Sequence, residues 1–229
     1  INTTPSACFE DTLHSIASGE YCNHGAGEIT YLGFLQNNVL TPRIMVCVDP
    51  SNNVTFWTKH YLSETSSCEE SQDLVHMVKE RLLESTTEFV VGFLTPSCDF
   101  ETKSERELTH FSENTALFLT KLHYGNWKKL EEKIRKQLGR KAGKVPVKII
   151  TGAFGDSEKR TGHVFKVVVV DGKIFGTYVG VNFDGSEKKT LCERKPDCGW
   201  SSKEGKIYCC TLNARLMKRM GLELADLNN

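Results

Sequence analysis

Apolar and polar residues alternate along several stretches of this chain in the period-two pattern of half-buried β-strands. The stretch over residues 41–62, TPRIMVCVDPSNNVTFWTKHYL, alternates on both sides of the turn-forming residues 49–53 and therefore predicts a β-hairpin. Two later stretches, VPVKIITGAFG and GHVFKVVVVDGKIFGTYVGVNF, predict three more strands. The last two of these strands are expected to turn at Asp171-Gly172, because Asp-Gly favours a two-residue hairpin loop.

One stretch follows the helical period instead. Over residues 123–140, HYGNWKKLEEKIRKQLGR, apolar side chains recur every three or four positions, at Trp127, Leu130, Ile134 and Leu138. We expect this helix to end at Gly139, since glycine commonly caps helices. Glu131 and Arg135 stand four positions apart on one edge of the helix and can form an ion pair. Because strands dominate elsewhere, the sequence predicts an α+β fold with a central antiparallel sheet flanked by helices.

The composition is that of a globular protein. The chain has 229 residues, of which 39% are apolar and 25% charged, so we expect a single domain over residues 1–229. No apolar run approaches the roughly 18–20 residues of a membrane helix, which predicts a soluble protein without a membrane partner. The acidic stretch SETSSCEESQD, over residues 63–73, is expected to be an exposed loop.

Nine cysteines favour disulfide bonds over a zinc site, because none is paired at CxxC spacing or grouped with histidines. Disulfides predict a secreted, extracellular protein, and two N-glycosylation sequons at Asn2 and Asn53 agree with this. The chain starts at Ile1, so we expect a mature form whose signal peptide has been removed. One cysteine must remain unpaired, and we expect it to be Cys98, which lies in an apolar stretch.

Charge is unevenly distributed although the formal net charge is zero. Residues 1–120 carry 17 acidic and 6 basic side chains, a net charge of −11, whereas residues 121–229 carry 12 acidic and 23 basic ones, a net charge of +11. Between Lys121 and Lys148, ten Lys or Arg residues accompany only Glu131 and Glu132. This run predicts a surface that binds a polyanion, unless the two halves of the chain complement each other across a shared interface.

Four segments, taken in order, resemble the DNA/RNA non-specific endonuclease family of the ββα-metal fold: GFLTPSCDF, FSENTALFLTKLHYGNWKKLEEKIRK, VKIITGAFG and VFKVVVVDGKIFGTYVGVNF. The resemblance covers roughly residues 40–215 and is most specific in the helix, where Trp127 is followed by Leu130, Glu131 and Arg135. The hairpin at residues 41–62 and the segment IYCCTLNARLMKRMGLE resemble its secreted arthropod branch, which includes salivary and digestive proteins. This implies a ββα-metal nuclease-like fold, with residues 1–39 as a disulfide-bearing N-terminal extension.

The family hydrolyses phosphodiesters with a metal ion, and the resemblance implies that this chain lacks several of the residues involved. In the family, the histidine of an Asp-Arg-Gly-His loop deprotonates water and a helix asparagine holds magnesium. Here the loop aligns with residues 90–93, so that Phe93 occupies the position of the base and Val91 that of the arginine. His123 stands at the asparagine position, and a Pro-Gln pair of the family aligns with Leu117-Phe118.

Three residues match the remainder of the family site, namely Asn114, Glu131 and Arg135, and Arg135 falls on the phosphate-facing position. His123 with Glu131 could bind a metal, but imidazole suits zinc, copper or nickel better than magnesium. A lone histidine at the start of a helix is more often a cap or a surface residue. We therefore expect no intact catalytic site and no cofactor.

Three functions are compatible with these residues. We expect a secreted, inactive or strongly impaired nuclease-like protein that binds DNA and RNA non-specifically through a basic groove. Its expected contacts are Lys121, Lys128, Lys129, Lys133, Arg135, Lys136, Arg140, Lys141 and Lys144. The second function is a weakly active metal-dependent endonuclease that uses His123 or His110 as its base. The third is a binder of another polyanion, such as a heparin-like glycan, or of a host protein.

Overall fold

An eight-stranded sheet in which all neighbouring strands are antiparallel forms the centre of the fold. The computed structural model describes residues 12–64, 88–155, 162–183, 191–195, 200 and 202–228. The strands follow the order β1-β2-β3-β4-β7-β8-β9-β10. Their bounds are β1 Thr12–Cys22, β2 Gly27–Gln36, β3 Val39–Asp49, β4 Val54–Tyr61, β7 Val147–Phe154, β8 His163–Val170, β9 Lys173–Val181 and β10 Ile207–Cys209. The predicted central antiparallel sheet is therefore confirmed.

Both predicted hairpins are present. Strands β3 and β4 pair up to Asp49 and Val54, and Asp49 Oδ1 accepts a hydrogen bond of 2.9 Å from the backbone N–H of Ser51 inside the turn. Strands β8 and β9 are joined at Asp171-Gly172, where both residues have positive φ angles of 50° and 72°. Positive φ at both central positions is the conformation for which an Asp-Gly pair is suited, so turn chemistry sets this register.

A two-stranded ribbon and the main helix form a second layer. Strands β5 (Phe89–Phe93) and β6 (Thr115–Leu119) pair with each other, and α2 (Lys103–Leu108) lies between them in sequence. After β6 the chain continues through α3 (Thr120–Leu122), a π-helical turn η5 (His123–Trp127) and α4 (Lys128–Ala142). The predicted cap at Gly139 is wrong, because the apolar side of α4 continues to Ala142 and Gly143 caps the helix instead.

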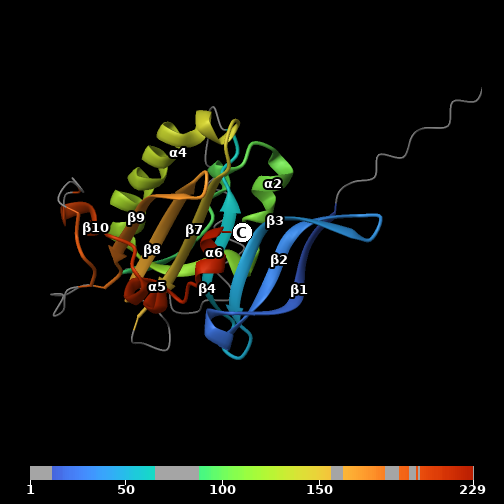
Figure 1. Cartoon of the computed structure of the whole chain (residues 1–229), viewed down its shortest axis with the longest axis horizontal. Helices are drawn as coiled ribbons and strands as arrows, with labels where there is room; N and C mark the ends of the chain where they lie inside the picture. Colours follow the sequence, from blue (N-terminus) through green and yellow to red (C-terminus); the bar gives the residue numbers. More distant parts are fainter. Residues whose placement is uncertain are drawn as a thin grey trace, which may run out of the picture.

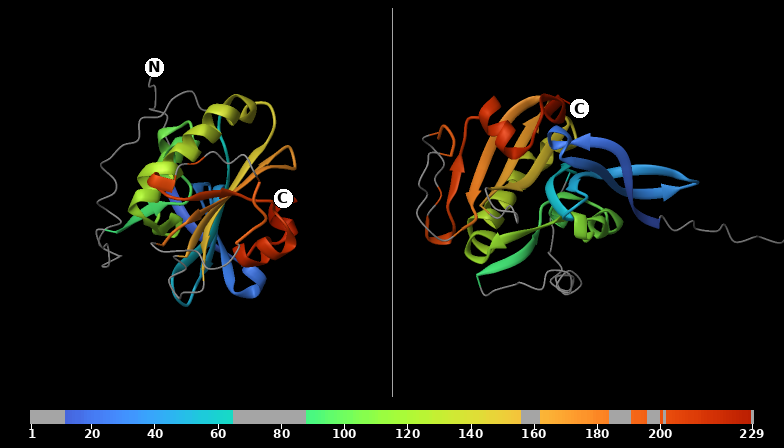
Figure 2. Two further views of the ribbon diagram at one scale, coloured as in Figure 1. Left: turned by 90° about the vertical axis from the view of Figure 1, so that its left-hand side faces the viewer. Right: turned by 90° about the horizontal axis from the view of Figure 1, so that it is seen from below.

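Helices cover both faces of the central sheet, as the left view of Figure 2 shows: α4 lies on one face, and the two C-terminal helices lie on the other. On one face, Leu130 and Ile134 of α4 pack with Ile149 and Val168 of the sheet. On the other face, α5 (Ala214–Met220) and α6 (Leu224–Asn228) cover a separate core that includes Trp57. Strands β2 and β3 carry a third core, in which Leu32 and Ile44 pack with Phe100 and with Leu108 of α2, and the β2–β3 hairpin projects from the sheet (Figure 1).

Disulfide bonds hold both ends of the described chain. Cys22 at the end of β1 is bonded to Cys47 in β3, and Cys192 is bonded to Cys210. Cys98 and Cys209 are disulfide-bonded as well. The prediction that Cys98 is the free cysteine is therefore wrong, because burial in an apolar surrounding suits half of a disulfide as well as it suits a thiol.

Two further expectations concern the surface. Asn53 is exposed in the β3–β4 turn, whereas Asn2 and residues 65–73 of the predicted acidic loop lie outside the described residues. Within the described part of the chain, no helix combines the length and the apolar character needed to cross a membrane.

Candidate functional site

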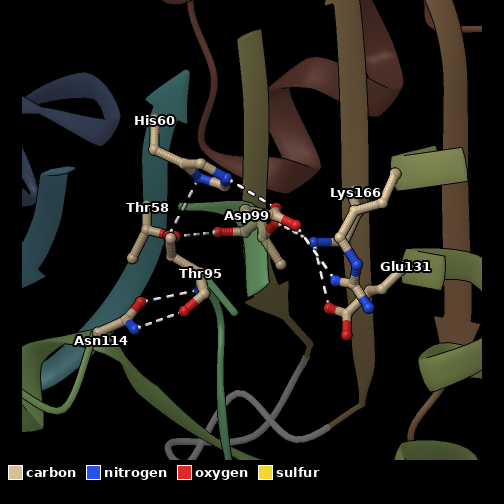
Figure 3. A network of polar contacts seen from close by, with 9 residues as sticks. Thr58, His60, Thr95, Asp99, Asn114, Glu131 and Lys166 are labelled. Carbon is tan, nitrogen blue, oxygen red and sulfur yellow. Dashed lines mark hydrogen bonds and ion pairs between the residues drawn. The ribbon is translucent and has the colours of Figure 1, made fainter. Parts of the chain in front are cut away.

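Buried polar side chains gather between the central sheet and the layer that contains α4 (Figure 3). Thr58 of β4, Thr151 of β7 and Lys166 of β8 are direct cross-strand partners, so their side chains share one face of the sheet. His60 lies two positions after Thr58 and therefore points to the same face. All four side chains are almost completely buried.

Both ring nitrogens of His60 have hydrogen-bond partners. Nε2 lies 2.9 Å from Oδ2 of Asp99, and Nδ1 lies 3.2 Å from Oγ1 of Thr95 (Figure 3). A carboxylate only accepts, so Nε2 donates to Asp99, and Nδ1 of the neutral ring accepts from the Thr95 hydroxyl. The Thr58 hydroxyl, 2.8 Å from that of Thr95, then donates to it. The bonds thus run in one direction from Thr58 to Asp99.

Asn114 supports this chain of hydrogen bonds by binding the backbone of Thr95. Its Oδ1 accepts from the backbone N–H of Thr95 at 2.8 Å, and its Nδ2 donates to the carbonyl oxygens of Thr95 and Thr109 at 2.9 and 2.8 Å. The side chain of Asn114 is fully buried. Asn114 therefore fixes the backbone that presents Thr95 to His60.

Two ion pairs connect α4 to the network. Arg135 Nη1 donates to Asp99 Oδ1 at 3.2 Å, and Lys166 Nζ lies 3.3 Å from Glu131 Oε1. Lys166 also donates to Thr151 Oγ1 at 2.7 Å. Glu131 and Arg135 were expected to pair with each other along the helix edge, but each is bound by a residue from another element. That edge of α4 faces the protein interior, where cross-element partners are available.

Burial and neighbouring charges shift the pKa values of three groups in the network. Burial alone would raise the pKa of Asp99, but hydrogen bonding from His60 and the cations Lys166 and Arg135 hold this pKa below its usual value. Burial lowers the pKa of His60 despite the Asp99 carboxylate, and Lys166 lowers it further. Burial raises the pKa of Glu131, against the opposing effect of Lys166 and Arg135. At neutral pH we therefore expect a neutral His60 beside an ionised Asp99.

We predict that His60 makes the stability of the protein depend on pH below about 6.5. The folded state holds His60 neutral, whereas the unfolded chain binds a proton near the reference pKa of 6.5. The unfolded state then binds more protons, so the free energy of unfolding falls as pH falls, by up to about 1.4 kcal/mol per pH unit. The raised pKa of Glu131 acts in the opposite direction, because the folded state takes up that proton first.

Chemical denaturation of the wild type and of His60→Gln between pH 7.5 and 5 measures this contribution. The variant is expected to be less stable at pH 7.5 but to lose less stability on acidification. Glu131 is common to both proteins, so the difference between the two curves reports His60 together with its effect on the pKa of Asp99. Parallel curves would show that His60 does not act in this way.

Phe93, which was expected at the position of a catalytic base, lies at the end of β5. Phe93 and Val91 share one face of the β5–β6 ribbon with their cross-strand partners Thr115 and Leu117, and all four are half-buried. The ring of Phe93 lies 5.6 Å from that of His110, measured between centroids. Burial lowers the pKa of His110, so this imidazole is neutral near pH 7. Hydrophobic residues thus occupy the aligned loop, with one neutral histidine beside it.

His123 packs against the other face of the same ribbon. Its ring centroid lies 5.0 Å from that of Phe118, and a Cβ atom at Gly92 would come within 2.7 Å of its Cε1 atom. Gly92 is thus required for the close approach of His123 to β5. The imidazole is placed by aromatic packing, which differs from the helix-capping role expected from its position.

The residues at the metal position do not fit a magnesium ion. Magnesium prefers oxygen ligands, but His123 offers an imidazole and Glu131 is engaged by Lys166. Asn114 contributes its amide to the backbone around Thr95. Among the described residues, no group of three or more His, Cys, Asp and Glu side chains is arranged to hold a metal.

The predicted nucleic-acid contacts fall into two groups. The first group is exposed, on α4 or close to its ends: Lys121, Lys129, Lys133, Lys136, Arg140, Lys141 and Lys144. Lys129 is paired with Glu204, and Lys133 Nζ lies 5.4 Å from the ring centroid of Trp200. Lys128 is half-buried, and only 13% of the Arg135 side chain is exposed. Arg135 thus belongs mainly to the buried network.

The sequence reasoning did not single out His60, Thr95, Asp99 or Lys166. A signal was available for Lys166, because it is the one charged residue within the apolar strand VFKVVVV. A charge in a strand that is buried on both faces needs a partner from a neighbouring element. Nothing in the local sequence points to Asp99 as the acceptor for both His60 and Arg135, since these residues meet only in the folded chain.

Comparisons with known proteins identify a similar fold. No protein-family model matches the chain, and no curated protein matches it. A chain from the structure described as "Crystal structure of the EndoG/EndoGI complex: Mechanism of EndoG inhibition" superimposes with a TM-score of 0.54. The two chains are 15% identical, and the similarity covers 83% of this chain and 86% of that chain. At this identity, the match shows a shared fold.

Proposed function

We propose that this chain is a secreted, single-domain nuclease-like protein that binds DNA and RNA through the exposed basic side of α4 and does not cleave them efficiently. The ribbon β5–β6 followed by α3, η5 and α4 gives the strand-strand-helix order of the ββα-metal nucleases. The similarity to a chain of the EndoG/EndoGI complex supports this assignment. The disulfide bonds are compatible with secretion, and the secreted arthropod branch is the expected relative.

The observation that carries the binding proposal is the distribution of charge around α4. Its inner side is apolar, whereas Lys129, Lys133, Lys136 and Arg140 are spaced by four, three and four positions and so share the outer side. At a rise of 1.5 Å per residue, this outer stripe is about 17 Å long. Glu132 is the only acidic residue among the exposed positions of the helix. A row of cations of this length can contact several phosphates without reading bases.

We predict that cleavage of DNA and RNA is lower by at least about 10²–10⁴ than in a relative with an intact site. Loss of the general base alone has an effect of this size, and Phe93 cannot accept a proton. Phe93→His is not expected to restore activity, because Val91 and His123 remain and Glu131 is bound to Lys166. Digestion of plasmid DNA and of RNA with magnesium, manganese or zinc measures the cleavage rate of the wild type and of Phe93→His.

The same purified sample should be tested for binding at the enzyme concentrations used for digestion. Retarded but undigested DNA is the expected result. Robust magnesium-dependent digestion by the wild type would overturn the loss of catalysis, whereas full activity of Phe93→His would show that the rest of the site is intact. His110 lies beside Phe93, so His110→Ala tests the alternative base: a residual activity that disappears in this variant would identify a weak enzyme.

A protein partner is the second candidate. The structural neighbour comes from a complex of two proteins, EndoG and EndoGI. In this chain the half-buried side chains of Val91, Phe93 and Leu117 give the β5–β6 ribbon an apolar face where the nuclease family has charged residues. Competition separates the ligands: displacement of DNA by heparin at equal charge would indicate a general polyanion binder, and failure to bind any polyanion would favour a protein ligand.

A further inference from the structure

Tyr124 is a large aromatic side chain that stays exposed at the break between α3 and α4. Its exposed fraction is 60%, although it lies within the otherwise packed π-helical turn η5. The next residue, Gly125, leaves the helical conformation with φ −98° and ψ −114°. A Cβ atom at Gly125 would meet the backbone carbonyl oxygen of Glu204 at 2.3 Å. The chain therefore bends where another segment crosses it.

The ring of Tyr124 has a rigid support. His123 contacts it edge-on, with centroids 4.9 Å apart and an interplanar angle of 63°. His123 in turn packs on Phe118, and Phe118 lies 5.9 Å from the buried ring of Trp127. This series of aromatic contacts runs from the core to the surface. A supported, exposed ring loses little conformational entropy when a planar ligand stacks on it.

The sequence on both sides of Tyr124 is basic. Between Leu117 and Leu130 the sequence contains Lys121, Lys128 and Lys129 and no acidic residue. Glu204 approaches this segment from η6 (Ser202–Glu204) and is paired with Lys129. An exposed aromatic ring beside cations is the combination with which proteins hold single-stranded nucleic acid, because each base has a π-face and each nucleotide a phosphate.

We propose that Tyr124 stacks on an unpaired base, so that the protein prefers single-stranded over double-stranded nucleic acid. This inference rests on the proposed function, and it adds the form of the ligand. In a duplex the base faces are covered by neighbouring base pairs, so Tyr124 can contribute only to binding of a single strand. The cations of α4 contribute to both forms.

The test compares three probes: a dT 20-mer, an abasic 20-mer with the same number of phosphates, and a 30-bp blunt duplex. Tyr124→Ala is expected to weaken binding of the dT 20-mer by about 5- to 150-fold, the range measured for single stacking contacts. Binding of the abasic strand and of the duplex should change by less than about twofold. Because stacking releases no counterions, the salt dependence on the dT 20-mer should stay unchanged.

Matched variants separate stacking from other effects. Tyr124→Trp is expected to keep the preference for the dT 20-mer, and Tyr124→Leu to lose it. Tyr21→Ala removes a more exposed tyrosine, 80% exposed on β1, and should change nothing. An equal loss on all three probes, or no loss on the dT 20-mer, would refute the stacking role while leaving the proposed function intact. If the wild type binds none of the probes, both proposals fail.

Discussion

Replacing Lys129, Lys133, Lys136 and Arg140 together by glutamine is expected to weaken duplex binding by about three orders of magnitude at 0.15 M salt. Each phosphate contact adds about 0.9 to the slope of log K against log salt, which amounts to about fivefold in affinity at this concentration. Four contacts then give the stated loss. The four side chains are exposed on α4 and do not take part in the buried network, so the fold should be retained.

Salt titration gives a second, independent measure. The wild type is expected to show a slope of about −4 to −5, from about five phosphate contacts, and the quadruple variant a slope shallower by about 3.6. Measuring one 30-bp duplex at four or five salt concentrations yields both quantities. Lys129 is paired with Glu204, so Lys129→Gln tests its contribution separately and should give the smallest single change.

A control with the same loss of charge is available elsewhere on the surface. Lys103, Lys173, Arg215 and Lys218 are exposed and lie outside α4. Their joint replacement by glutamine changes the net charge equally but removes no predicted contact, so the salt dependence should remain that of the wild type. Equal effects of the two quadruple variants would mean that net charge alone attracts the ligand, and flat salt dependence of the wild type would contradict phosphate binding.

The elements that local patterns specify could be predicted from the sequence. The β8–β9 turn follows from Asp171-Gly172, and α4 follows from the spacing of its apolar residues. Its exposed basic side follows from the same spacing, because the apolar positions define the inner side. The end of the helix could not be predicted, because Gly139 and Gly143 are equally good caps by residue type.

The roles of Glu131 and Arg135 could not be predicted from spacing. At four positions apart they can pair along a helix, and the resemblance to a nuclease family assigned Arg135 to the phosphate and Glu131 to the remainder of the catalytic site. The structure shows that both lie on the edge of α4 that meets the sheet, where Lys166 and Asp99 bind them. These partners are 35 or more positions away in sequence, so only the fold brings the charges together.

Removing the Asp99 carboxylate is expected to destabilise the protein by about 3–5 kcal/mol. Asp99 accepts from His60 and from Arg135, and it is buried at the centre of the network. Asp99→Ala leaves the Arg135 cation without its acceptor and the Nε2–H group of His60 without a hydrogen bond. Breaking a buried ion pair by removal of one partner has a cost of this size. Asp99→Asn keeps an acceptor oxygen and should be intermediate.

Urea denaturation of a double-mutant cycle identifies the cause of the loss. Arg135→Met keeps much of the side-chain volume but removes the cation, so the double variant Asp99→Ala with Arg135→Met should be more stable than the sum of the two single losses predicts. Glu132→Ala, on the exposed side of α4, should change the free energy of unfolding by no more than about 0.5 kcal/mol. A loss below about 1 kcal/mol for Asp99→Ala, or strict additivity in the cycle, would show that the network does not hold α4 on the sheet.

Binding of nucleic acid by the folded Arg135→Met variant separates the two roles of this residue. Unchanged salt dependence would mean that Arg135 serves stability, whereas a slope shallower by about 1 would mean that Arg135 contacts a phosphate.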